Sequence, residues 1–121
     1  MAGTITITEE TYSTVKKIKF EWTSDAAGAA DGATIKAYSG EVIRLVTIPG
    51  GGANQPTDLY DAVMNDEDNT DVFMGAGANR SNASTQQVLA SSLGCVANDK
   101  LSLSVTNAGN SKSGTVYLYI R

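Results

Sequence analysis

Residue types that support catalysis are scarce in this chain of 121 residues, which has no histidine and one cysteine, Cys95. Without an imidazole, Ser-His-Asp and Cys-His nucleophiles are excluded, and so is a conventional zinc-hydrolase centre. Cys95 lies among small and apolar neighbours, Leu93 to Ala97, with no cation beside it. Because thiol reactivity requires a lowered pKa, we expect a buried, unreactive thiol. The sequence predicts no catalytic residue and no enzyme.

The acidic residues form the densest cluster of chemically active side chains. Asp66-x-Asp68-x-Thr70 resembles the start of a calcium-binding loop, but position six is Asp71 instead of glycine and position twelve is Gly77 instead of glutamate. Nothing in the sequence places two carboxylates across a cleft, as sugar hydrolysis would need. We expect a solvated acidic turn with no metal and no cofactor. Calcium binding by another geometry stays open, with Asp66, Asp68 and Asp71 as the candidate ligands.

Two tyrosines near the end of the chain are the most suggestive surface residues. The segment 114–121 alternates, so that its valine, leucine and isoleucine point one way and Tyr117, Tyr119 and Arg121 the other. Tyrosine offers a large contact area at low entropic cost, which suits an interface. The alternative is that the two rings cover a neighbouring loop or the other side of their own sheet.

Basic residues on two other predicted strands are further candidates for a partner interface. Lys16, Lys17 and Lys19 form a short run, for which a solvated strand face is the simplest interpretation and contact with an acidic partner the alternative. Arg44 interrupts a near-continuous apolar strand, 41–48. Such a run indicates burial on both faces, or an interface on the second face.

The elements that must position these residues are short strands separated by turns. Segments 100–106 and 114–121 both alternate, and we predict that they pair as an antiparallel hairpin. A long strand at 12–23, with a bulge near Lys16 and Lys17, should bury Ile18, Phe20 and Trp22. Further strands are expected at 4–8, 33–39, 41–48, 59–64 and 85–90, with a turn at Gly40, inward side chains at Tyr60, Ala62 and Met64, and a connector at 93–99.

These patterns predict an all-β chain: a two-sheet antiparallel β-sandwich, jelly-roll-like, of about eight strands, in a single domain spanning 1–121. No segment has the length and apolarity of a membrane span, and the first residues lack the features of a signal peptide, so we expect assembly in a cytoplasm. The net charge of −4 argues against direct binding of nucleic acid.

Several segments together resemble small β-rich virion proteins of tailed bacteriophages, those described as structural or decoration proteins. The matching segments are 18–23, 40–47, 65–80 with its Asp-Val-Phe-Met-Gly-Ala-Gly-Ala-Asn-Arg core, and 107–121. They cover more than half of the chain in order, and none is a mechanistic motif.

The resemblance implies a capsid decoration or cement protein, a homotrimer with a jelly-roll or sandwich fold. Such a protein would bind the major capsid protein on the capsid exterior and help the head to resist internal pressure. Two alternatives remain at this point. One is a tail, baseplate or head-to-tail joining component, and the other is a carbohydrate-binding sandwich with Trp22, Tyr38 or Tyr60 as stacking platforms, although we expect Trp22 to be buried.

Overall fold

A computed structural model describes residues 3–121 and confirms the all-β, two-sheet prediction. Nine strands are present instead of about eight, together with two single-turn 3₁₀ helices at Gly52–Asn54 and Ala90–Ser92. The strands are β1 Thr4–Tyr12, β2 Val15–Thr23, β3 Ala30–Ala33, β4 Tyr38–Pro49, β5 Asp61–Asn65, β6 Gln86–Leu89, β7 Cys95–Asp99, β8 Ser102–Thr106 and β9 Ser113–Ile120.

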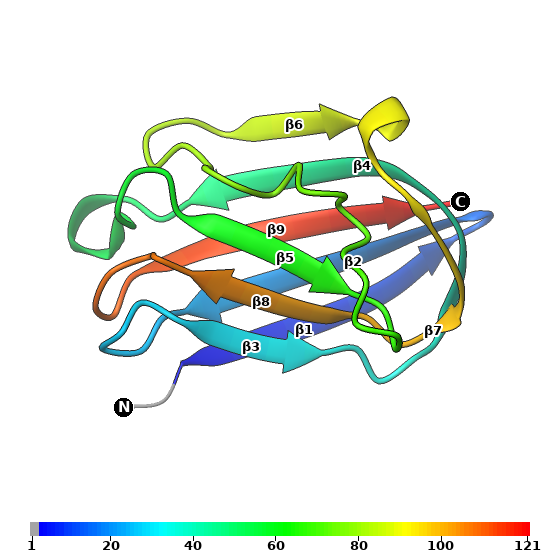
Figure 1. Ribbon diagram of the computed structural model, residues 1–121, viewed down its shortest axis with the longest axis horizontal. Helices are drawn as coiled ribbons and strands as arrows, with labels where there is room; N and C mark the ends of the chain where they lie inside the picture. Colours follow the sequence, from blue (N-terminus) through cyan, green and yellow to red (C-terminus); the bar gives the residue numbers. More distant parts are fainter. Residues whose placement is uncertain (1–2) are drawn as a thin grey trace.

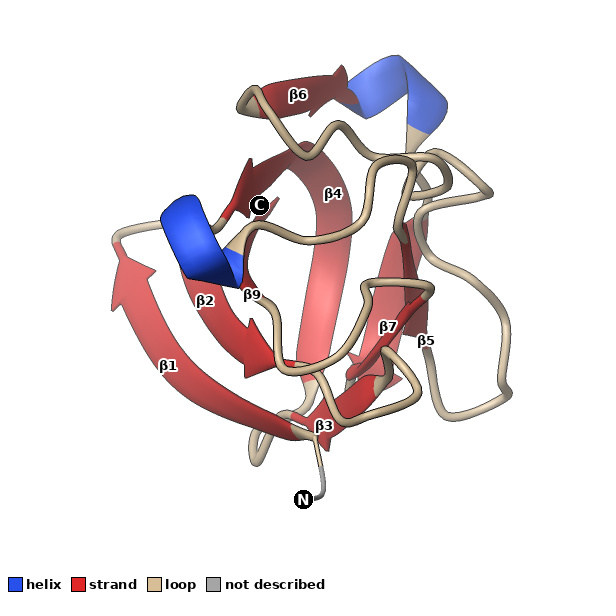
Figure 2. Ribbon diagram, turned by 90° about the vertical axis from the view of Figure 1, so that its left-hand side faces the viewer, coloured by secondary structure: helices blue, strands red, loops and turns tan. Residues whose placement is uncertain are grey.

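The strands form two antiparallel layers that face each other across one core (Figures 1 and 2). The larger sheet has the order β1-β2-β9-β4-β6, with β7 pairing with β4 outside this path, and the smaller sheet has the order β3-β8-β5. In the larger sheet β9 lies between β2 and β4, and in the smaller one β8 lies between β3 and β5. From β2 to β6 successive strands alternate between the layers, and so do β7, β8 and β9, as in a jelly roll; β6 and β7 follow each other within the larger sheet, and β1 adds an outer strand beside β2.

The predicted hairpin between the last two strands is wrong. β8 pairs with β3 and β5, whereas β9 pairs with β2 and β4, so segment 107–112 carries the chain from one sheet to the other. The apolar faces of both strands were identified correctly, since Leu103, Val105, Leu118 and Ile120 are all buried. These faces meet across the core instead of lying side by side. Alternation predicts which face of a strand is buried, but it does not predict which strand lies beside it.

The predicted strand 12–23 is β2, which begins later, at Val15, and the predicted strand 4–8 is β1, which extends to Tyr12. A turn at Ser13 and Thr14 ends β1 and begins β2, with Ser13 at a positive φ of 57°. The pairing of β2 with β1 and with β9 is continuous through Lys16 and Lys17, so the expected bulge is absent from β2. The alternation of apolar residues changes phase at Val15 because a turn precedes this residue.

The segment around residues 30–40 also differs from the prediction. β3 occupies Ala30–Ala33, ahead of the expected strand 33–39, and segment 34–37 forms bends. Gly40 is not a turn, because it lies within β4, where the register with β7 shifts at its positive φ of 137°. The expected connector 93–99 instead contains strand β7, which pairs with this part of β4.

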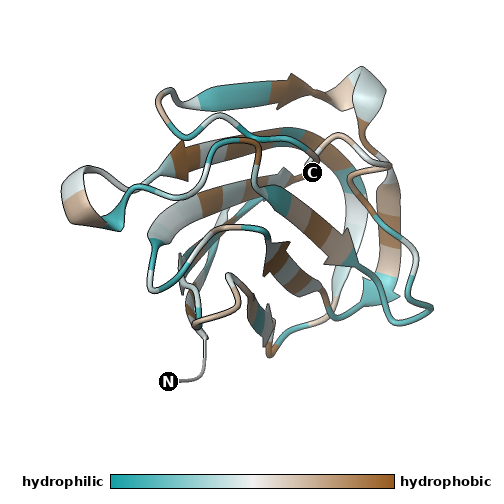
Figure 3. Cartoon of the chain, turned by 60° about the vertical axis from the view of Figure 1, so that its left-hand side comes forward, coloured by the Kyte–Doolittle hydropathy of each residue, from teal (hydrophilic) through white to brown (hydrophobic). Residues whose placement is uncertain are grey.

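The core consists of the inward faces that alternation predicted. Ile18, Phe20 and Trp22 of β2 are buried, and so are Tyr60, Ala62 and Met64 of the facing layer. Figure 3 shows apolar and polar residues alternating along the strands, as expected when one face of each strand packs inward. On β4, residues Leu45, Val46 and Thr47 are buried in succession, so both faces of this strand are covered at that point.

One half-buried carboxylate, that of Glu9, fastens the edge strand β1 to the loop after β3. Glu9 accepts hydrogen bonds from the amides of Ile35 and Lys36, at 3.0 and 3.1 Å, and from the hydroxyl of Tyr38 at 2.7 Å. Burial tends to raise the pKa of Glu9, but these three hydrogen bonds outweigh it and hold the pKa below its ordinary value. Burial, together with the bond to Glu9, raises the pKa of Tyr38.

Candidate functional site

The outer face of the larger sheet carries two rows of side chains that cross five strands. Strand register places Glu10, Lys17, Tyr119, Arg44 and Leu89 in the first row. The second row consists of Thr8, Lys19, Tyr117, Val46 and Gln87. We call these two rows the outer face. Paired residues of neighbouring strands project on the same side of a sheet, so each row is a continuous line of contacts.

The two tyrosines at the centre of the outer face form a cation-capped stack. Their ring centroids are 6.3 Å apart with an interplanar angle of 25°. Lys17 Nζ lies 5.1 Å from the ring centre of Tyr117, and the Arg44 guanidinium lies 5.1 Å from that of Tyr119. Each cation–π contact of this kind contributes about 0.5–1 kcal/mol at an exposed site. The rings are therefore held in place while half-exposed.

Polar contacts also hold Arg44 and Lys19 in place on the outer face. Arg44 Nε donates a hydrogen bond of 2.9 Å to Gln87 Oε1, which holds the guanidinium over the sheet. Lys19 Nζ lies 3.0 Å from Glu21 Oε1, and this partner raises the pKa of Lys19. Leu89, next to Arg44, is 76% exposed. The outer face thus combines aromatic, cationic and apolar groups, all of them at least partly exposed except Val46, which is 5% exposed.

The structure brings together four of the six predicted interface residues. Lys17, Arg44, Tyr117 and Tyr119 meet on the outer face as described. Lys16 does not belong with them: it pairs with Ile120, on the inward side of the sheet, and its Nζ donates a 3.2 Å hydrogen bond to the Ser39 carbonyl. The reason is that adjacent residues of a strand point to opposite faces.

Arg121 lies one position beyond β9. Its backbone exchanges two hydrogen bonds of 2.9 Å with Glu41, which ties the end of the chain to β4, and the residue is exposed. This backbone pairing fixes Arg121 at the margin of the outer face.

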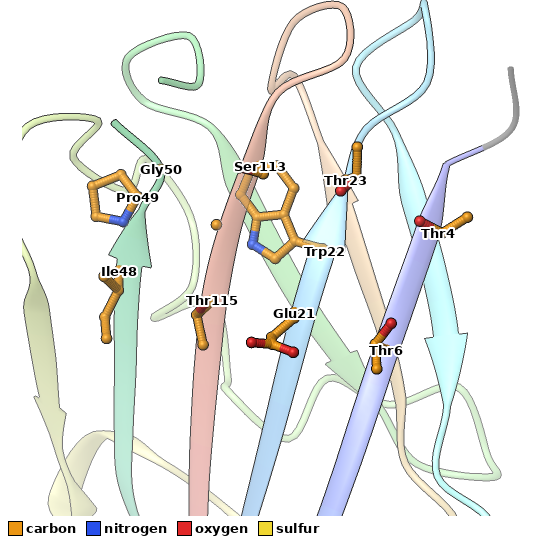
Figure 4. A pocket seen from close by; sticks show the side chains of 11 residues that line it. Thr4, Thr6, Glu21, Trp22, Thr23, Ile48, Pro49, Gly50, Ser113 and Thr115 are labelled. Carbon is orange, nitrogen blue, oxygen red and sulfur yellow. The ribbon is translucent and has the colours of Figure 1, made fainter. Parts of the chain in front are cut away.

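The sequence analysis missed a hollow that adjoins the outer face. It has a volume of about 310 Å³ and lies over the ends of β1, β2, β9 and β4 (Figure 4). Hydroxyl groups of four threonines and a serine line it together with Glu21, Ile48 and Pro49: Thr4, Thr6, Thr23, Ser113 and Thr115. Gly114 and Trp22 also line the hollow, and the indole of Trp22 packs directly against the backbone of Gly114. The alternation of threonines at 4 and 6 was the available signal.

The acidic candidates serve the backbone of their own turns. Asp66 Oδ1 accepts hydrogen bonds from the amides of Asp68 and Thr70, at 2.9 and 3.0 Å. Asp71 accepts three amide hydrogen bonds with its two oxygens, at 2.9–3.1 Å. Within residues 3–121, no three His, Cys, Asp or Glu side chains lie close enough together to hold a metal ion. The cluster therefore has a structural explanation.

Two other expectations need correction. Cys95 is exposed, not buried, because it lies on β7 opposite Glu41 and its side chain points away from the core. The rings of Trp22, Tyr38 and Tyr60 are buried, so none of them can serve as a stacking platform for a sugar. Trp22 and Tyr60 instead contact each other in the core, with ring centroids 5.4 Å apart.

Comparisons with protein-family models, with curated proteins and with solved structures find no match to this chain. In the part of the chain that the structure describes, no helix is long and apolar enough to cross a membrane.

Proposed function

We propose that this protein is a structural component of a tailed-bacteriophage virion, a decoration protein that binds the exterior of the major capsid lattice and stabilises the head. The observation that carries the proposal is the outer face, where a tyrosine stack is held in place by Lys17 and Arg44 on an uncovered sheet. The segments that resemble virion proteins support it, since two of them contain Arg44 and the two tyrosines.

The physical argument is that an ordered aromatic surface loses little entropy when it binds. Tyr117 and Tyr119 are already fixed by stacking and by cations, so that contact with a flat partner buries apolar area with little further ordering. One such contact is weak. Many copies on a lattice add up, because a ligand that binds only the assembled state stabilises that state by mass action.

The charges of the outer face define the chemistry of the partner. Lys17, Lys19 and Arg44 project there, against Glu10 in the first row and Glu21 just beyond the second. Glu21 pairs with Lys19, so Lys17 and Arg44 are the cations left for a partner. We infer a partner surface that is acidic and flat, and a homo-oligomer that presents several outer faces at once. The resemblance implies a trimer.

Cosedimentation with purified capsid shells tests the proposal. The wild-type protein should pellet with shells and raise the temperature at which they open. Arg44→Glu should weaken binding at least tenfold, while Lys100→Glu, a matched charge reversal at an exposed residue between β7 and β8, should leave it unchanged. If both variants bind like the wild type, the outer face is not the adhesive surface.

The same experiment separates the proposal from its main alternative. A tail, baseplate or head-to-tail joining component would be found in tails or at a portal vertex, at low copy number, and would not bind empty shells. Quantifying the protein in purified heads and tails therefore decides between the two. Exclusive recovery in tails would refute a role in decoration.

A further inference from the structure

The two sheets have four edges, which differ in how well they are protected. In the smaller sheet, β3 has four residues, and β5 is flanked by segment 71–80, which donates and accepts backbone hydrogen bonds along it. In the larger sheet, the edge beside β4 consists of two short strands, β6 with four residues that run into a 3₁₀ helix and β7 with five. The fourth edge, β1, has nine residues and pairs only with β2.

The free side of β1 exposes a regular row of backbone groups. The two-residue turn after Tyr12 makes Tyr12 and Val15 a hydrogen-bonded pair, so alternate residues back to Thr4 bond to β2. The amides and carbonyls of Ile5, Ile7, Glu9 and Thr11 therefore point away from β2. They form no backbone hydrogen bond with any residue of 3–121. Figure 2 shows β1 at the margin of its own sheet, with the start of the strand close to β3 of the other layer.

Natural proteins usually protect such an edge with lysine, proline, a bulge, a short strand or an inward-pointing charge. β1 has no lysine, proline or bulge, and its register with β2 is continuous from end to end. Its one inward-pointing charge is Glu9, whose carboxylate is already bound to amides of its own chain. The segment 4–8 is unprotected and is a template for another strand.

We propose that β1 pairs antiparallel with β1 of a second copy, about a two-fold axis at Ile7, to give a dimer with one continuous sheet. In this register Ile7 faces Ile7, Thr6 faces Thr8, and Ile5 faces Glu9, with about six new inter-strand hydrogen bonds between residues 5 and 9. No carboxylate faces another carboxylate. A two-fold axis at Glu9 would oppose two glutamates and is disfavoured.

The side chains beside β1 support a second copy as the occupant. Ile5 and Ile7 point inward but are only half-buried by their own chain. Ile35, which is 84% exposed, lies beside Glu9 because its amide donates a hydrogen bond to that carboxylate. In the proposed register each Ile35 approaches Ile5 of the other copy. Three isoleucines from each copy would thus be covered together.

The contact is isologous, so it joins copies in pairs. A contact made by one strand and three isoleucines from each copy is small, and we expect a roughly micromolar dissociation constant. In a trimeric assembly such a contact would link one trimer to the next. It uses the backbone edge of β1, whose Thr8 and Glu10 end the two rows of the outer face, and it does not involve the tyrosine stack, so either proposal can fail alone.

Sedimentation velocity across a dilution series, combined with amide exchange of the full chain, tests the dimer. The wild type should shift from dimer to monomer on dilution, and the amides of Ile5, Ile7 and Glu9 should lose protection over the same range. Ile7→Pro should be monomeric at all concentrations, since the lost amide bonds to nothing within its own chain and proline is tolerated on an open edge. Ile7→Val should dimerise like the wild type.

Three results would overturn the proposal. These are a wild type that stays monomeric at several hundred micromolar, an oligomer in which these amides exchange freely, and a folded Ile7→Pro that still dimerises. If Ile7→Pro does not fold, the amide exchange of the wild type decides whether the dimer forms through β1. A monomeric Ile7→Pro that still pellets with capsid shells would leave the proposed function intact.

Discussion

The sharpest test of the packing concerns Gly114, whose missing side chain leaves room for the single tryptophan of the chain. A Cβ at this position would lie 2.6 Å from Cζ2 and 2.8 Å from Cε2 of Trp22, and 3.0 Å from the Ile48 carbonyl oxygen. All three distances are shorter than normal contacts allow. Gly114→Ala therefore forces the indole to move, and the indole is 1% exposed and packed against Tyr60.

The expected magnitude follows from two opposing effects. Overpacking a filled core costs about 1–3 kcal/mol, and replacing glycine by alanine within a strand returns about 0.5–1 kcal/mol. Because the clash is with a buried, packed ring, the upper part of the overpacking range, about 2–3 kcal/mol, applies. The net loss in the free energy of unfolding should then be about 1–2.5 kcal/mol, which corresponds to a fall in Tm of about 4–10 °C for a domain of this size.

Gly51→Ala is the matched control, because no heavy atom lies within 4 Å of the added Cβ and its φ of −111° suits any residue. It should change the free energy of unfolding by less than about 0.5 kcal/mol. Urea unfolding followed by tryptophan fluorescence measures both variants, and the emission maximum of Trp22 reports its displacement directly. Equal stability of the two variants, with unchanged fluorescence, would refute the packing described for Gly114.

Three further predictions concern stability and accessibility. Glu9→Gln should lower the free energy of unfolding by about 1 kcal/mol at pH 7, a value reduced for partial exposure, because it weakens the contact with Tyr38 and two amides. Since the folded-state pKa of Glu9 lies below its ordinary value of 4.5, its contribution is present above pH 4.5 and lost as pH falls through the lower value, and acid titration of wild type and variant should show this difference. Asp71→Asn should cost about 1–2 kcal/mol in thermal or urea unfolding, because Asp71 accepts three amide hydrogen bonds, whereas Asp68→Asn should be nearly neutral. Cys95 should react with a maleimide in the folded protein to the same extent as in urea, and protection in the folded state would contradict its exposed position.

The faces of the strands could be predicted from the sequence because alternation is a local property. Ile18, Phe20 and Trp22 are inward as expected, and on β9 the same rule placed Tyr117 and Tyr119 outward. Burial on one side of a sheet forces a period of two, so the pattern alone indicates the face.

The neighbours of each strand could not be predicted in this way. β8 and β9 follow each other and alternate equally well, which favoured a hairpin, yet they lie in different sheets. In an interleaved sandwich the partners of a strand are distant in sequence. Leu89 and Gln87 were missed for this reason, since β6 reaches the outer face only through its pairing with β4.

The prediction for the interface also depended on which face each residue points to and which strands lie beside it. Lys17 and Lys16 were grouped as one basic run, but a one-residue difference places Lys17 over Tyr117 and turns Lys16 toward Ser39. The cation–π contacts could not be foreseen, because they join β2 to β9 and β4 to β9 across nearly the whole chain.

The distribution of charge explains how a chain of net charge −4 can present cations at the centre of one face. Carboxylates such as Asp25, Asp66 and Asp71 accept amide hydrogen bonds in turns, and those bonds hold the pKa of Asp25 below its ordinary value. Lys17 and Arg44, in contrast, project from strand centres onto one face. Overall net charge therefore sets solubility, and the local field of the outer face sets the partner. Binding to an acidic surface should then weaken as salt rises, although the protein itself is acidic, and binding that is insensitive to salt would place the contact elsewhere.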